Sequence, residues 1–194
     1  MSVFMRRVAL TTSVAFTSFS QTRDSRNKSM YTTMQVKAHA SRLRDVLSEM
    51  GHEIKYSHCL EVVSNIEGYP DWNTHAAELN RNQERAEQYL DEVLESEEEA
   101  SYEKFTRRCE KKYIVSFTEA KFLRDLRDIR EDFGNYVSRE FMGCVAAERR
   151  ERDPRTENMV RYIWRGIFDK NDVLITMGIY HDGGTYYMDG CGYQ

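Results

Sequence analysis

The chain has 194 residues, enough for one sizeable core or for a small core with a helical appendage. Its 40% hydrophobic and 12% aromatic residues exclude global disorder, and no run approaches the roughly 18 apolar residues that a membrane-spanning helix needs. The net charge of −4 is unevenly distributed, because residues 1–30 carry +4 and the remainder therefore −8. An acidic body disfavours bulk nucleic acid and favours a protein partner.

Residues 1–30 are predicted to be a basic, flexible leader. Arg6 and Arg7 precede a mildly apolar stretch that serines and threonines interrupt, and no AxA cleavage site follows. We expect a tail or an upstream start rather than a signal peptide, with a cleaved leader left open. The expected localisation is the cytoplasm.

Residues 31–80 are predicted to form a three-helix unit. From Val36, apolar residues recur at steps of three and four, and Gly51 supplies a left-handed stop. A second helix is expected up to Gly68, and Pro70 and Asp71 open a short third one.

Residues 81–111 are predicted to be an acidic helical linker, either solvated or used as a binding surface. Between residues 81 and 100 the acidic residues are balanced by only two basic residues, both arginines. The candidate residues for contact with a protein partner are Glu92, Glu95, Glu97, Glu98 and Glu99.

Residues 112–194 are predicted to form an α/β sheet domain, so the fold class is α+β. Tyr113–Phe117 indicates a strand, and a long amphipathic helix should follow from residue 119. Its apolar stripe comprises Phe122, Leu126, Ile129, Phe133, Val137, Phe141 and Cys144. After Pro154 the period changes to two, and turn residues at 169–172 and 181–184 predict an antiparallel three-strand meander.

Several arginines and aromatic residues near the end of that helix suit single-stranded nucleic acid. This alternative patch comprises Arg149, Arg150, Arg161, Trp164 and Arg165. Acidic neighbours dilute its charge, and an arginine-rich helix end also has a purely electrostatic explanation.

The cysteines and histidines predict no metal site and no cofactor. The four cysteines lack CxxC spacing, and the five histidines lack HxH or HxxxH spacing. No nucleophile motif or phosphate loop appears either, so no catalytic residue is assigned.

Three segments of the helical unit carry a family resemblance: residues 37–44 (KAHASRLR), 57–61 (SHCLE) and 68–74 (GYPDWNT). Residues 36–80 resemble the short "glyoxalase-related" domain of bacterial and mobile-element proteins. The resemblance implies a bacterial, plasmid or phage context and no established activity. The order of elements in residues 112–189 also resembles the vicinal-oxygen-chelate module of glyoxalases, with His181 and Glu157 as the available ligands.

These observations favour a non-enzymatic interaction or regulatory protein of a bacterial mobile element or phage, which binds a protein partner. The alternative is a nucleic-acid-associated factor that binds weakly through the basic patch. A metal-dependent, glyoxalase-like enzyme is the third hypothesis, and a homodimer is left open.

Overall fold

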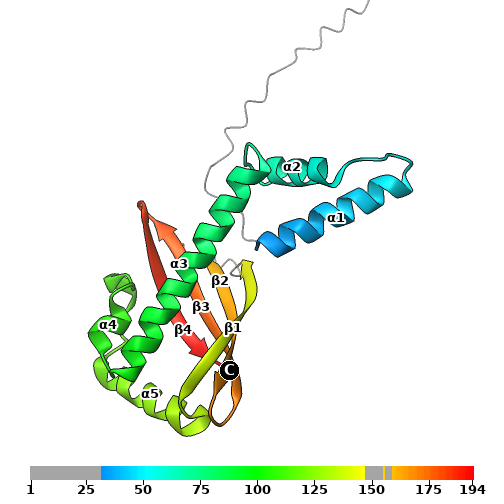
Figure 1. The fold of residues 1–194 in the computed structure, drawn as a ribbon. Coiled ribbons are helices and arrows are strands. Elements are labelled where there is room, and N and C mark those ends of the chain that lie inside the picture. Colours follow the sequence, from blue (N-terminus) through cyan, green and yellow to red (C-terminus); the bar gives the residue numbers. More distant parts are fainter. Residues whose placement is uncertain (1–31, 147–154, 156–158) are drawn as a thin grey trace, which may run out of the picture.

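The computed structural model describes residues 32–146, 155 and 159–194. Helices come first and a four-stranded antiparallel sheet follows, so the predicted α+β class is confirmed (Figure 1). The helices are α1 (Thr33–Glu49), α2 (Tyr56–Ile66), α3 (Trp72–Glu98), α4 (Tyr102–Thr106), the 3₁₀ helix η1 (Lys111–Tyr113) and α5 (Glu119–Phe133). The strands are β1 (Tyr136–Ala146), β2 (Val160–Phe168), β3 (Asp172–Asp182) and β4 (Thr185–Tyr193).

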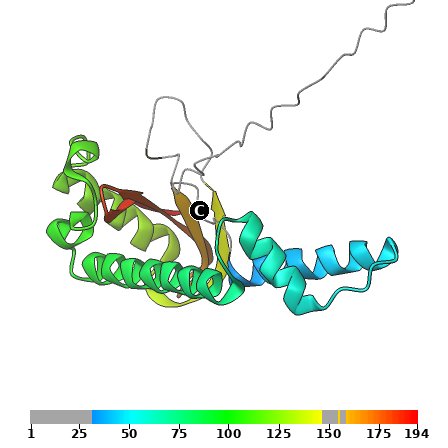
Figure 2. The same cartoon turned by 90° about the horizontal axis from the view of Figure 1, so that it is seen from above.

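The N-terminal helices have a small core of their own. Thr32 and Gln35 form a capping box at the start of α1, and Asp71 caps the first turn of α3. The buried residues between these helices are Val36, Ala40, Cys59, Leu60, Val63 and Leu79. Helices α1 and α2 project to one side of the sheet, and α3 runs from them across the sheet (Figures 1 and 2).

The predicted acidic linker corresponds largely to α3, which continues through residue 80 without a break. Ala86, Tyr89, Leu90 and Val93 lie in the main core with the sheet. The expectation of a wholly solvated segment is therefore wrong. One face of this helix is acidic and exposed, and the other packs on the sheet as in any amphipathic helix.

The predicted long helix ends eleven residues before Cys144, because Gly134 stops it. Gly134 has φ +85°, and a Cβ there would lie 1.5 Å from Oδ1 of Asp169. Only glycine combines a positive φ without strain and the absence of a Cβ that would collide with Asp169. Val137, Phe141 and Cys144 consequently belong to strand β1 and not to a helical stripe.

The strand predicted at Tyr113–Phe117 is also wrong. Lys111–Tyr113 is a single 3₁₀ turn, and Val115 is fully on the surface at 82% exposure. The aromatic residues of this segment pack individually: Tyr113 contacts Tyr180 edge-on, and Phe117 packs against Phe105. A short apolar run without strict alternation does not by itself specify a strand.

The sheet is a meander in the order β1-β2-β3-β4, so the predicted hairpins are confirmed and β1 is the fourth strand. Its inner face joins the core with α3 and α5. The inner residues of the two central strands are Tyr162, Trp164, Phe168, Val173, Ile175, Met177 and Ile179. The C-terminal residue is held to the sheet, because Gln194 exchanges two backbone hydrogen bonds with Leu174. None of the helices in the described part has the length and apolar character that crossing a membrane requires.

Candidate binding cleft

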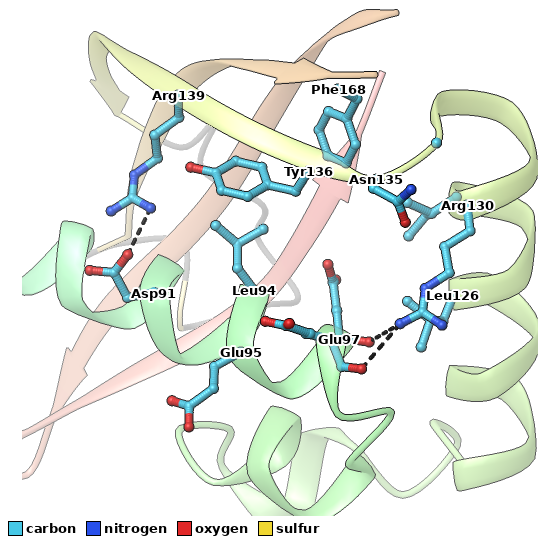
Figure 3. A pocket seen from close by; sticks show the side chains of 13 residues that line it. Asp91, Leu94, Glu95, Glu97, Leu126, Arg130, Asn135, Tyr136, Arg139 and Phe168 are labelled. Carbon is cyan, nitrogen blue, oxygen red and sulfur yellow. Dashed lines mark hydrogen bonds and ion pairs between the residues drawn. The ribbon is translucent and has the colours of Figure 1, made fainter. Parts of the chain in front are cut away.

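A cleft of about 570 Å³ lies between the C-terminal half of α3, the helix α5 and the start of β1. Figure 3 shows side chains entering it from these three elements. Its apolar lining comprises Leu94, Leu126, Ile129 and Phe168, and its charged lining comprises Asp91, Glu95, Glu97, Glu98, Arg130 and Arg139. The volume falls in the range of known ligand sites.

The turn between α5 and β1 forms one end of the cleft. Gly134 reverses the chain, and Asn135 then donates its backbone and side-chain N–H groups to the two carboxylate oxygens of Asp169, both at 2.9 Å. From the same β2–β3 turn, Lys170 donates to the carbonyl oxygen of Glu131 at 2.6 Å. The α5–β1 turn and the β2–β3 turn, which are distant in sequence, are thus tied together, and this fixes α5 relative to the sheet.

Glu97 is the most unusual side chain of the cleft. It is only 8% exposed, although it stands in a run of glutamates. Tyr193 of β4 donates its hydroxyl to Oε2 of Glu97 at 2.6 Å. Burial raises the pKa of Glu97 to about 7, because removing a carboxylate from water disfavours its charged form.

Glu97 also lines a second cavity, of about 220 Å³. Cys191 and Tyr193 line that cavity with it, and burial raises the pKa of both the thiol and the phenol. These two groups are therefore neutral near pH 7, and Glu97 is the group of this cluster that exchanges a proton there.

The two arginines of the cleft are engaged by other protein groups. Arg139 contacts Asp91 at 2.7 Å and Glu87 at 2.8 Å, and is 16% exposed. Arg130 donates to the backbone carbonyl oxygens of Glu97 and Glu98, at 2.6 and 3.3 Å (Figure 3). Both arginines hold α3 against its neighbours.

The five predicted partner-binding glutamates differ in their surroundings. Glu92 forms a bidentate pair with Arg108, which lowers the pKa of its carboxyl group. Glu95 and Glu99 share Lys104, at 3.0 and 2.5 Å. Glu97 is buried, and Glu98 is exposed. The acidic run is thus partly neutralised within the chain, and the cleft brings together only Glu95, Glu97 and Glu98.

The alternative nucleic-acid patch is not assembled as predicted. Arg149 and Arg150 lie outside the described residues, as does Glu157. Trp164 is fully buried and donates its indole N–H to Glu87 at 2.8 Å, so no base can stack on it. Arg161 and Arg165 are exposed on the face of the sheet opposite to Trp164. On that face Arg165 pairs with Asp172.

Possible metal ligands are dispersed over the described part of the chain, where no three His, Cys, Asp or Glu residues are grouped to hold an ion. His181 packs against Tyr186, and the buried His75 stacks on Tyr69. Nδ1 of His75 lies 3.2 Å from the hydroxyl of Ser64. Burial lowers the pKa of His75, so its neutral form is favoured.

The sequence did not indicate Arg130, Arg139, Asn135 or Tyr193 as site residues. Their roles depend on contacts between residues 33 to 96 positions apart. Glu97 carried a local signal, because it follows Ala86, Leu90 and Val93 at steps of four, three and four. A carboxylate on the apolar face of a helix indicates a buried acid.

No curated protein and no solved structure shows a significant match to this chain. A family model matches a segment that covers α1, α2 and most of α3 and ends at the residue before Glu97. The resemblance seen in residues 36–80 is thereby confirmed and extended: residues 25–96 match the family described as "Glyoxalase superfamily protein".

Proposed function

We propose that this protein is a non-enzymatic interaction protein whose cleft receives a positively charged segment of a protein partner. The regulatory role and the mobile-element or phage origin belong to the same hypothesis, and they rest on the family resemblance alone. The proposal uses Glu95, Glu97 and Glu98 of the original five glutamates and adds Asp91.

The observation that carries the proposal is the acidic rim of a preformed cleft. The side chains of Asp91 and Glu95 are 66% and 60% exposed, and Glu98 is also exposed. They line the same cleft as Leu94, Leu126, Ile129 and Phe168, so a lysine or arginine can place its methylene groups on the apolar residues and its charge near the carboxylates. Rim charges of this kind steer association and set specificity more than they set affinity.

A binding titration with peptides tests the proposal. Fluorescence anisotropy would compare a labelled twelve-residue peptide rich in lysine and arginine with a glutamate-rich peptide of equal length. We expect the basic peptide alone to bind, and we expect the E95K/E98K variant to bind it at least tenfold more weakly.

The matched control is E49K/E53K, which changes the net charge equally at the exposed turn between α1 and α2. It should bind the peptide like the wild type at physiological salt, where distant charges are screened. If both variants bind the basic peptide equally weakly, net charge alone explains the loss of affinity, and a role for the cleft is contradicted. Tighter binding of a single-stranded RNA or DNA pool than of the basic peptide would favour the nucleic-acid alternative.

A further inference from the structure

One of the two carboxylate oxygens of Glu97 has no hydrogen-bond donor among the described residues. Tyr193 donates to Oε2, whereas none of the described residues donates to Oε1. The residue as a whole is only 8% exposed. Buried carboxylates usually have several hydrogen-bond donors, because an unpaired one is costly. Glu97 can therefore accept one more donor, and it lines the cleft together with the apolar residues.

The electrostatic surroundings favour a cation over an anion as that donor. The cleft lies at the C-terminal end of the 27-residue helix α3, where the helix dipole is negative, and no basic residue occupies its last turn. Four carboxylates and two arginines line the cleft. Asp91 pairs with Arg139 and Glu95 with Lys104, whereas Glu97 and Glu98 have no ion-pair partner among the described residues. The remaining potential is negative.

The floor defines the rest of the ligand. Leu94, Leu126, Ile129 and Phe168 offer an apolar surface that suits methylene groups. We propose that the cleft binds an alkyl chain that ends in a primary ammonium or guanidinium group, with the Glu97 carboxylate as the partner of the cation. The inference rests on the proposed function where a partner's lysine or arginine supplies the chain, and a free alkylamine has the same chemistry.

Binding of the cation is coupled to the ionisation of Glu97, whose pKa burial raises to about 7. The groups near this carboxylate from other elements are Tyr193 and Cys191 of β4 and Arg130 of α5, and Asp125 and Asp189 also line the smaller cavity. The pKa values of Tyr193 and Cys191 are raised, so these two groups stay neutral between pH 6 and 8. Alkylamines and guanidines stay protonated in this range. Affinity should therefore be about tenfold higher at pH 8 than at pH 6, as Glu97 ionises.

Isothermal titration calorimetry on the full chain tests this inference with small probes. Nα-acetyl-lysine N-methylamide and Nα-acetyl-arginine N-methylamide represent a partner's side chain, and 1,4-diaminobutane represents a free amine. Nα-acetyl-norleucine N-methylamide lacks the cation and is the neutral control. We expect one molecule of a cationic probe to bind, and we expect the E97Q variant to weaken binding at least tenfold while E99Q leaves it unchanged.

Several results would overturn the inference: no binding of any cationic probe at 10 mM, equal binding of the norleucine probe, or undiminished binding to E97Q. The pH dependence in the wild type gives a second test that does not need a variant to fold. If basic peptides bind through Glu95 and Glu98 but E97Q has no effect, only this inference fails. If 1,4-diaminobutane binds through Glu97 while basic peptides do not bind, the proposed partner function fails and a free amine remains as the ligand.

Discussion

Replacement of Glu97 by glutamine should make the protein more stable at pH 8. The unfolded chain ionises Glu97 with a pKa of 4.5, and burial raises the pKa of the folded state to about 7. The folded state therefore loses stability as the pH rises from 4.5 through 7, because the unfolded chain releases the proton first. A difference of this size corresponds to about 3 kcal/mol above pH 7, at 1.36 kcal/mol per pKa unit.

Glutamine avoids that penalty and still offers an oxygen to the Tyr193 hydroxyl. We expect E97Q to be about 2–3 kcal/mol more stable than the wild type at pH 8 and nearly equal to it at pH 5. Urea unfolding at both pH values measures the difference, and E99Q is the control because Glu99 is exposed and paired with Lys104. A difference between E97Q and wild type that stays constant from pH 5 to pH 8 would refute the raised pKa.

Three further outcomes follow from the fold. G134A should lower the unfolding free energy by at least about 1–3 kcal/mol, because an L side chain is strained at φ +85° and collides with Asp169; a variant as stable as wild type would refute the turn geometry. W164A should cost about 3–5 kcal/mol, the usual range for a buried aromatic residue, and an unchanged melting temperature would mean that Trp164 is on the surface. Burial lowers the pKa of His75, so the unfolded chain takes up the proton first and the folded state loses stability as the pH falls below 6.5. The unfolding free energy of wild type relative to H75Q should therefore decrease between pH 7 and pH 5.5. A difference that stays constant over this range would contradict the burial of His75.

The fold class and the hairpins were predictable because their signals are local. Residues 169–172 and 181–184 have turn chemistry, and the strands on either side alternate in exposure as a half-buried sheet requires. Capping residues such as Asp71 and Thr118 likewise mark helix starts that the structure confirms.

The prediction of a helix over residues 137–144 was wrong because the apolar residues of a strand there happen to keep the spacing of a helix. Val137, Phe141 and Cys144 continue the helical spacing of Phe122 to Phe133, so one glycine at position 134 was the only local sign of a change to a strand. Short apolar segments leave helix and strand indistinguishable by periodicity alone, and pairing with β2 decides the outcome.

The cleft was beyond local reasoning for a different reason. The run of acidic residues around Glu97 was visible in the sequence. Its partial neutralisation, in which Lys104 pairs with Glu99 and Arg108 with Glu92, depends on how the segment after α3 folds back against that helix. The hydrogen bond from Tyr193 joins residues 96 positions apart. Composition gives the number of charges, whereas burial and pairing decide which of them remain available to a partner.

The most direct test of the account is NMR shift mapping on the ¹⁵N-labelled full chain titrated with the basic peptide. The account predicts that amide shifts concentrate at the cleft, in residues 91–98 of α3 and 130–139 of α5 and β1. Shifts confined to the outer sheet face around Arg161 and Arg165, or to α1 and α2, would contradict it. An unchanged spectrum at millimolar peptide would contradict it as well.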